Sequence, residues 1–372
     1  TVTLTVTATS TVTPTATPTL TASPTPTSSA TQTPTFTATS TPTPSATSTA
    51  TPSATPTNTA SPTATPTNSP TPAAVQKAID VGFVVSDVSG APQSQVSPQE
   101  VNAVKAAGAT LVRINFRLPG AADTSWTPQI LAAYGTAVSA FESAGIGVLG
   151  LVTAGATNDN IQADWQANSN ETTGGTGDNN FIHNTYTSAL TTLVNSFHGS
   201  PYNVKLWELW NEPNVYGTGG CCTGSSYIYP SNFAALLADS YLAIKGGPSP
   251  ITDVTLISGG IFGHSNGGGA YTSSNAQPGD PPDNDPLNDP EGYLTETYKF
   301  GVTSSAWQQV QTQLHTYPLD AVGQHIYVDQ SGYSTPATIQ AYMDWLRAAY
   351  TAYEGATTSK QTIVTEAGWS TG

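Results

Sequence analysis

Two short runs of the sequence each place a glutamate among aromatic and polar residues. The first run reads Trp-Asn-Glu-Pro and contains Glu212, and the second reads Thr-Glu-Ala-Gly-Trp and contains Glu366. Each run ends a stretch with the apolar, β-branched character of a buried strand. Two carboxyl groups can cleave a glycosidic bond, because one protonates the leaving oxygen while the other attacks or stabilises the anomeric carbon. The two runs therefore predict paired-carboxylate chemistry on a sugar.

Strand-like runs alternate with longer amphipathic stretches from about residue 75 onward, which indicates a parallel sheet covered by helices. We predict strands at Val81–Val85, Thr110–Phe116, Gly147–Val152, Lys205–Trp210, Val254–Ser258, Ala321–Tyr327 and Thr362–Glu366. We predict helices at Pro98–Ala107, Pro128–Ala144, Asn180–Phe197, Pro230–Lys245, Ser304–His315 and Pro336–Tyr353. The pattern is that of an α/β (β/α)8 TIM barrel, in which both glutamates emerge at the same carboxyl-terminal rim.

The predicted barrel is one strand short of closure. A closed (β/α)8 barrel needs an eighth strand and at least one more helix. The sequence reaches Gly372 directly after the seventh strand. We therefore expect a barrel truncated after strand seven.

The two runs resemble the strand-four and strand-seven signatures of clan A glycoside hydrolases, a group of retaining (β/α)8-barrel enzymes. The resemblance covers the domain from about Val81 to Gly372. It extends to cellulase-like and mannanase-like members of family five and to xylosidase-like members of family thirty-nine. It implies that Glu212 is the general acid/base and Glu366 the nucleophile of a double displacement, which cleaves a β-linked polysaccharide or oligosaccharide without a cofactor.

The resemblance also implies roles for residues on other strands. Arg113 matches a strand-two arginine that lies near the nucleophile and helps to keep it ionised. Asn211 matches the asparagine that binds the sugar 2-hydroxyl. His325 and Tyr327 match a strand-six pair, in which the tyrosine hydroxyl contacts the nucleophile and the histidine lines the sugar site. Arg113 in a structural ion pair and His325 as a satisfied core histidine are the alternatives.

Three neighbours of the carboxylate pair have other interpretations. The strand-eight tryptophan of the family has no counterpart in the sequence, so Trp369 and Trp210 are candidates for the sugar-binding surface. Glu208 faces the same side of its strand as Glu212 but lies lower. For Glu208 we therefore predict a buried structural pairing rather than catalysis.

The two carboxyl groups need different environments. The acid/base should have a raised pKa, whereas donors such as Arg113 and Tyr327 should keep the nucleophile charged. Retention of configuration further predicts carboxyl groups about 5 to 5.5 Å apart, against about 6.5 to 9.5 Å for inversion.

Residues 1–74 consist mainly of Thr, Pro, Ser and Ala and contain no Asp, Glu, Lys or Arg. Such a composition cannot form a core and favours extended chain. We predict a disordered linker over residues 1–74 and one catalytic domain over residues 75–372. The linker indicates a secreted or cell-surface bacterial protein, tethered to the cell or to another module.

The charge of the domain restricts its partners. A formal net charge of -15 argues against binding to nucleic acid, whose phosphates attract Lys and Arg, and is compatible with a neutral polysaccharide. No apolar run approaches the roughly 20 residues that span a bilayer, so we predict no membrane span.

The sequence predicts no metal site. No cluster of His and Cys indicates zinc, and residues 280–291 are interpreted as a solvated Pro-rich loop, with a calcium loop as the alternative. Cys221 and Cys222 are adjacent, so a disulfide between them would be strained. Free thiols and a vicinal bridge are both open.

Two other functions are open. The first is a non-catalytic carbohydrate-binding surface protein on a barrel scaffold, which would not need both glutamates and their neighbours. The second is a transglycosylase, which uses the same covalent intermediate and passes the sugar to another sugar instead of to water.

Overall fold

The computed structural model describes residues 76–120, 122–157, 181–214, 228–263, 290–328 and 336–369. All of them lie in the unit Pro70–Gly372. The predicted linker over residues 1–74 lies outside the described residues.

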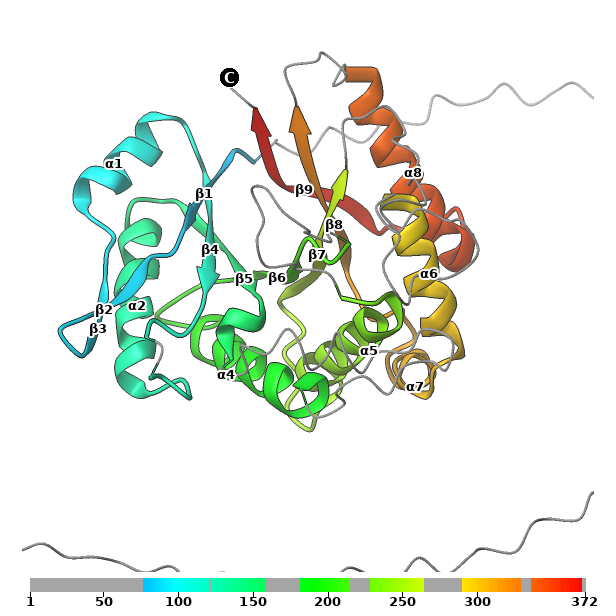
Figure 1. Cartoon of the computed structure of the whole chain (residues 1–372), viewed down its shortest axis with the longest axis horizontal. Coiled ribbons are helices and arrows are strands. Elements are labelled where there is room, and N and C mark those ends of the chain that lie inside the picture. The colour runs from blue at the N-terminus through cyan, green and yellow to red at the C-terminus, as the bar shows by residue number, and fades with distance from the viewer. Residues whose placement is uncertain are drawn as a thin grey trace, which may run out of the picture. The chain divides into compact units, whose positions relative to one another are not determined.

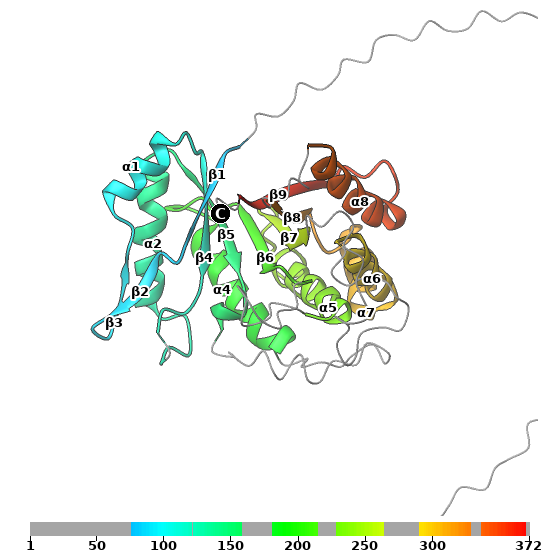
Figure 2. The same ribbon diagram turned by 45° about the horizontal axis from the view of Figure 1, so that its top comes forward.

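Seven strands form one sheet in the order β1-β4-β5-β6-β7-β8-β9, and every neighbouring pair is parallel. The strands are β1 (Ala78–Gly82), β4 (Leu111–Phe116), β5 (Gly147–Val152), β6 (Leu206–Asn211), β7 (Thr255–Gly263), β8 (Ala321–Val328) and β9 (Gln361–Trp369). The sheet is curled, with the helices on its outer side (Figures 1 and 2). The predicted α/β architecture is confirmed, and an eighth strand is absent from the described ranges.

The first strand differs from its prediction. Val81–Val85 was the expected strand, but β1 covers Ala78–Gly82 and the chain then leaves the sheet. Val85 begins an antiparallel hairpin formed by β2 (Val85–Val88) and β3 (Ala91–Ser94). Its two-residue turn, Ser89 and Gly90, has φ of 56° and 83°, the left-handed pair typical of hairpins that follow strand twist.

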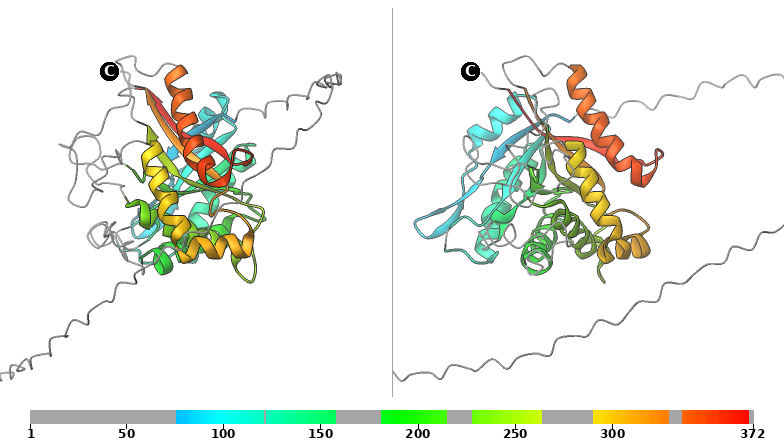
Figure 3. Two further views of the ribbon diagram at one scale, coloured as in Figure 1. Left: turned by 90° about the vertical axis from the view of Figure 1, so that its right-hand side faces the viewer. Right: turned by 45° about the vertical axis from the view of Figure 1, so that its right-hand side comes forward.

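Seven α-helices are described. They are α1 (Pro98–Ala106), α2 (Pro128–Ser143), α4 (Thr187–Phe197), α5 (Pro230–Tyr241), α6 (Pro290–Thr303), α7 (Ser305–Leu314) and α8 (Pro336–Glu354). Three of them, α1, α2 and α7, begin at a side-chain cap. Ser97 and Thr127 accept hydrogen bonds from the third residue of α1 and α2, and a proline follows each cap. Helix α6 was not predicted. It packs with α8 on the outside of the sheet (Figure 3).

The main core lies between the sheet and the helices. Phe116 of β4 stacks on Tyr134 of α2 at a centroid distance of 4.8 Å and contacts Trp207 of β6 at 5.4 Å. All three side chains are completely buried. Such aromatic packing fixes β4 and β6, the strands that carry Arg113 and Glu208.

A smaller apolar cluster forms the floor of the barrel interior. It consists of Leu149, Ile257 and Ala321, with Leu111, Leu206 and Ile363 packed against them. Leu111 and Leu206 precede Arg113 and Glu208 by two residues, so they lie on the same side of the sheet, one layer lower. The polar residues of the interior therefore sit above an apolar layer. None of the described helices is long and apolar enough to cross a membrane.

Candidate active site

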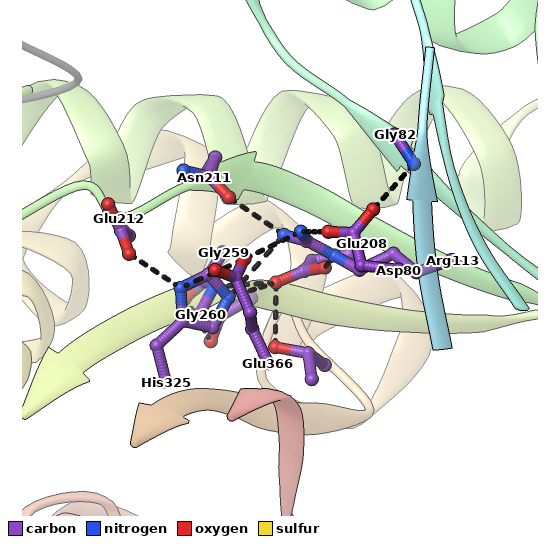
Figure 4. Close-up of polar contacts among 12 residues, drawn as sticks. Asp80, Gly82, Arg113, Glu208, Asn211, Glu212, Gly259, Gly260, His325 and Glu366 are labelled. Carbon is purple, nitrogen blue, oxygen red and sulfur yellow. Dashed lines mark hydrogen bonds and ion pairs between the residues drawn. The ribbon is translucent and has the colours of Figure 1, made fainter. Parts of the chain in front are cut away.

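Arg113 lies at the centre of a network of side chains inside the curled sheet. Its Nε donates to Glu208 Oε2 at 2.7 Å, and its Nη1 contacts Asp80 Oδ2 at 2.7 Å and Glu366 Oε2 at 2.8 Å. Its Nη2 donates to Asn211 Oδ1 at 2.7 Å (Figure 4). The guanidinium thus joins β1, β6 and β9, and these carboxylates raise its pKa although burial opposes them.

Glu208 is a structural carboxylate, as its position on the strand predicted. It is completely buried, and its Oε1 accepts hydrogen bonds from the Gly260 backbone N at 2.9 Å and from Thr365 Oγ1 at 2.8 Å. Burial alone would raise its pKa, but Arg113 and His325 outweigh burial and lower the pKa to about 2. Glu208 is therefore ionised, and both of its carboxylate oxygens accept hydrogen bonds from the protein.

His325 of β8 lies between the carboxylates. Its Nδ1 is 3.0 Å from Glu212 Oε1 and 3.7 Å from Glu366 Oε2, while its Nε2 is 3.4 Å from Glu208 Oε1. Burial lowers its pKa, but the hydrogen bonds to Glu208 and Glu212 raise it to about 9. The neighbouring carboxylates thus favour the cationic ring near neutral pH, although Arg113 Nη2 lies 3.4 Å from its Nε2.

Gly260 of β7 makes room for the His325 ring. A Cβ atom at this position would lie 2.0 Å from His325 Cδ2 and 2.8 Å from Thr365 Oγ1. No larger residue fits without moving the ring. The local sequence Gly259-Gly260 therefore belongs to the site, although its side chains carry no chemistry.

The two predicted catalytic carboxylates converge. One oxygen of Glu212, one of Glu366 and one ring nitrogen of His325 all lie within 4.8 Å of one another. Glu212 and Glu366 are 15 % and 21 % exposed, so both remain open to a ligand. The predicted separation of about 5 to 5.5 Å refers to the whole carboxyl groups, whereas the bound of 4.8 Å refers to their nearest oxygens.

The backbone at the end of β6 is strained in a way that directs these side chains. Trp210 and Glu212 have φ of 81° and 46°, a region that residues other than glycine rarely adopt. The two strained residues flank Asn211, which still pairs with Gly260 of β7. Glu212 therefore leaves the strand at a sharp turn that points its carboxyl group toward His325 (Figure 4).

The pKa of Glu366 is higher than expected, because the sequence predicted that neighbouring donors would keep this carboxyl group charged. Burial raises this pKa, His325 and Arg113 lower it, and Glu212 and Asp80 raise it, with a net increase over the ordinary value. The charge of Arg113 is shared among Asp80, Glu208 and Glu366. Burial is the largest cause of the raised pKa of Glu366, and the shared charge of Arg113 does not offset it.

Trp210 does not lie in the site, contrary to its prediction as a sugar-binding residue. It is 2 % exposed and contacts Phe181 and Tyr186, with ring centroids 6.2 and 5.9 Å away. Strand alternation from Glu208 would direct Trp210 inward, but its positive φ breaks the alternation and places the indole in the outer core.

Tyr327 and Trp369 are placed only by their backbones. Tyr327 pairs with Gly368, and Trp369 pairs with Val328 near the ends of β8 and β9. Their side chains lie outside the described part of the structure. The same holds for Cys221, Cys222 and residues 280–289, so the predictions for the thiols and the calcium alternative stay predictions.

Asp80 is the site residue that the sequence did not reveal. It lies on β1 and binds Arg113, and its other oxygen accepts a hydrogen bond from the Gly82 backbone N at 2.7 Å. The predicted first strand began at Val81, which left Asp80 outside the barrel. An acidic residue inside a parallel strand, level with Arg113 of the neighbouring strand, was the available signal.

Glu212, His325 and Glu366 have the residue types of a metal site. Protein side chains already bind this group, because Arg113 donates to Glu366 and His325 contacts Glu212. Among the described residues these three are the only such group.

The comparisons with known proteins show a distant likeness to solved structures alone. No family model matches the chain, and no curated protein matches it. A trimodular GH5_4 subfamily endoglucanase shares 13% identity at a TM-score of 0.44, over 79% of this chain and 48% of that one, so the chain spans about half the endoglucanase's length. A family 1 β-glucosidase from Thermotoga maritima shares 11% identity at 0.45, over 78% and 77%. A family 39 glycoside hydrolase from Bacteroides cellulosilyticus WH2 shares 19% identity at 0.39, over 78% and 49%. These activities are those of the named proteins.

Proposed function

We propose that the chain is a retaining glycoside hydrolase that cleaves a β-linked polysaccharide or oligosaccharide. The observation that supports this proposal most directly is the pair of carboxylate oxygens within 4.8 Å, with Arg113 bound to Glu366 and His325 to Glu212. Two carboxyl groups this close can act on opposite sides of one anomeric carbon without an intervening water.

In the first step, Glu366 attacks the anomeric carbon and Glu212 gives its proton to the glycosidic oxygen. The carbon–oxygen bond breaks, the alcohol leaves, and an ester joins the sugar to Glu366. In the second step, water attacks the anomeric carbon while Glu212 takes the water proton, and the bond between that carbon and Glu366 breaks, which releases Glu366 as a carboxylate. The two inversions retain the configuration.

The contacts of Arg113 support this division of roles. Arg113 binds Glu366, which favours the resting negative charge there, whereas Glu212 contacts His325. During the first step, negative charge moves from Glu366 to Glu212. His325 Nδ1 lies within 3.0 Å of one carboxylate and 3.7 Å of the other, so its proton can stabilise the charge at both ends of this movement.

Asn211 supplies a donor next to the reacting carbon. Arg113 occupies its Oδ1, and the side-chain nitrogen is then the atom left to bind a ligand. A hydrogen bond from this nitrogen to the sugar 2-hydroxyl would strengthen as the ring gains positive charge. The arrangement supports the role that the family resemblance implies.

Location and substrate form further parts of the proposal. The Thr/Pro-rich residues 1–74 support a secreted or cell-surface bacterial protein whose enzyme domain is tethered near an insoluble glycan. Immunodetection of the chain in the culture fluid or on the cell wall, against its absence from the cytoplasm, tests this location.

The first experiment measures release of reducing sugar from cellulose, mannan, xylan and mixed-linkage glucan by the full chain. Glu212→Gln and Glu366→Gln are expected to lower the rate by about 10²-fold or more, because each removes a group that acts in the transition state. Glu100→Gln on the outer helix α1 is the matched control and should retain full activity. Binding without hydrolysis of any glycan would favour a non-catalytic carbohydrate-binding protein.

A second experiment assigns the two roles by adding azide as a small nucleophile. In Glu212→Ala the covalent intermediate still forms, so azide should give a glycosyl azide of retained configuration. In Glu366→Ala azide replaces the nucleophile and should give the inverted product. The opposite pattern would exchange the roles of the two residues, and added sugar acceptors would reveal transglycosylation.

A further inference from the structure

An aromatic residue and a guanidinium at the ends of β1 and β4 form a pair that the catalytic proposal does not use. Phe83 directly follows β1, and Arg117 directly follows β4. Arg117 Cζ lies 4.0 Å from the centroid of the Phe83 ring. Phe83 is 58 % exposed, the largest value among the exposed large apolar residues that the structure describes. An aromatic ring this open, stacked on a cation, is suited to contact a ligand.

The pair lies at the same edge of the sheet as the carboxylates. Strands β1 and β4 are parallel neighbours, and their carboxyl ends meet the rim where β6 and β9 deliver Glu212 and Glu366. Asp80 lies three residues before Phe83 and binds Arg113. Three residues of chain span at most about 10 Å, so Phe83 is close to the catalytic network.

Both members of the pair are held in place from below. The turn before Phe83 is fixed by Gly82, which has φ of 61° and donates its N–H to Asp80 Oδ1. The backbone of Arg117 is clamped by Tyr134, whose hydroxyl accepts from Arg117 N at 2.9 Å and donates to Arg117 O at 2.8 Å. The backbone at this surface is therefore ordered before a ligand binds, which lowers the conformational entropy lost on binding.

Among the described residues, no salt bridge pairs Arg117 with a carboxylate. The chain has 24 acidic and 9 basic residues, and carboxylates bind Arg113, Lys205, Lys245, Lys299 and Lys360. In the part of the chain that the structure describes, the Arg117 guanidinium makes its one recorded contact with the Phe83 ring. A half-buried guanidinium left without an anion, in a protein of net charge -15, is the complement of an anionic ligand group.

We propose that Phe83 and Arg117 form a subsite for a uronic acid unit of the glycan. The apolar face of the sugar ring stacks on Phe83, and its carboxylate binds the fork of Arg117. This inference rests on the proposed glycosidase function and specifies its substrate class: a β-linked glycan that carries carboxylated sugars beside the bond that is cleaved.

The test compares one glycan backbone in two forms. The glucan or mannan that the full chain cleaves fastest is used as such and after oxidation of part of its C6 hydroxyls to carboxylates. For xylan, the unsubstituted and glucuronate-substituted polymers form the pair. We expect kcat/KM to be about tenfold or more higher for the carboxylated form, the size of a charge-assisted hydrogen bond.

Variants assign this preference to the two residues. Arg117→Gln should abolish the preference by lowering kcat/KM much more on the carboxylated form than on the neutral form, whereas Phe83→Ala should lower kcat/KM on both forms about two- to tenfold, because stacking needs no charge. Lys105→Gln is the control, since it makes the same change of net charge on the outer helix α1. Equal effects of Arg117→Gln on both forms, or a preference for the neutral form, would overturn the subsite.

The subsite can fail independently of the catalytic proposal. Hydrolysis that Glu212→Gln and Glu366→Gln abolish, without any preference for the carboxylated form, refutes the subsite alone. If no glycan is cleaved, the proposed enzyme function fails, and calorimetric titration with both forms decides the subsite. Tighter binding of the carboxylated form that Arg117→Gln removes would support it, and equal binding of both forms would reject it.

Discussion

Strand β9 carries one buried ion pair at its beginning and one charged network at its end, and the two differ in balance. Lys360, just before the strand, is paired with Glu354 of α8, and the two side chains are 5 % and 6 % exposed. The rings of Tyr298 and Tyr317 cover the ammonium at 6.0 and 5.8 Å. One cation meets one carboxylate, and the cluster is closed.

The network around Arg113 is unbalanced by comparison. Two cations, Arg113 and His325, face four carboxylates: Asp80, Glu208, Glu212 and Glu366. Glu208 is fully buried, whereas the other three are between 15 % and 37 % exposed. The candidate active site thus has more carboxylates than cations, and three of its carboxylates are open to solvent. The structural pair of Lys360 and Glu354 instead neutralises its own charge and excludes water.

The largest expected effect on stability comes from removing the cation of each cluster. Arg113→Met and Lys360→Met should each lower the free energy of unfolding by about 3 to 5 kcal/mol, because each leaves a buried carboxylate without its partner. Urea denaturation measures the loss. Hydrolytic activity should disappear in Arg113→Met and persist in Lys360→Met, so equal activity in the two would erase the distinction.

Removing the partner carboxylate as well sharpens the comparison. Lys360→Met with Glu354→Leu should recover most of the lost stability, since an isolated pair can be replaced by apolar residues. Arg113→Met with Glu208→Leu should not recover it, because Asp80 loses its cation and Glu366 keeps only the more distant His325 at 3.7 Å. Full recovery in both double variants would show that the two clusters are alike.

The next effect concerns the space for His325. Gly260→Ala should displace the ring, since the new Cβ would lie 2.0 Å from it, and should lower kcat by about tenfold or more through lost positioning. Gly199→Ala is the matched control, because a Cβ there meets nothing within 4 Å. Steady-state kinetics measure both, and unchanged kcat in Gly260→Ala would argue against a role for His325.

The dependence of stability on pH distinguishes the contribution of His325, which is lost at alkaline pH, from that of Glu208, which is lost at acidic pH. The pKa of His325 rises from 6.5 to about 9 on folding, so its stabilisation is complete below pH 6.5 and is lost as pH rises through 9. The pKa of Glu208 falls from 4.5 to about 2, so its stabilisation is present above pH 4.5 and is lost as pH falls through 2.

Thermal unfolding across this range measures both limbs. His325→Gln should flatten the loss of Tm between pH 6.5 and 9, and Glu208→Gln should flatten the loss at acidic pH. Alkaline and acidic limbs that both variants leave unchanged would contradict the charge states assigned to the network.

The smallest effect concerns the turn after β1. Gly82→Ala should cost about 1 to 2 kcal/mol, because φ of 61° disfavours residues with a Cβ. Chemical denaturation measures this cost. The same change should weaken binding at Phe83 more than hydrolysis of small glycosides, because it alters the edge of the site and leaves Glu212 and Glu366 in place.

Most of the sheet was predictable because its strands are short β-branched runs between amphipathic helices, and the order of the strands follows from parallel connection. The convergence of Glu212 and Glu366 followed from their place at strand ends. The alternation of side chains also predicted that Glu208 would be buried and paired. These features depend on local pattern and on strand direction.

The remaining errors have local physical causes. The predicted strand Val81–Val85 overlaps the end of β1 and the beginning of β2, because the chain turns at Gly82, whose φ is 61°. Trp210 was a candidate only because the strand-eight tryptophan of the family has no counterpart in the sequence, and its indole contacts Phe181 and Tyr186 instead. Asp80 and Gly260 escaped notice because their roles arise from contacts between strands that are far apart in the sequence.

One contact described above also has a mechanical meaning. Nη1 of Arg113 binds Asp80 of β1 and Glu366 of β9, which are the two outermost strands of the described sheet. The guanidinium therefore connects the two edges of the curled sheet. The radius of curvature of the sheet is thus linked to the position of the Glu366 carboxylate. A motion that separates β1 from β9 would lengthen the contacts of Arg113 with Asp80 and Glu366. The curvature of the sheet and the alignment of the reacting groups are therefore expected to change together.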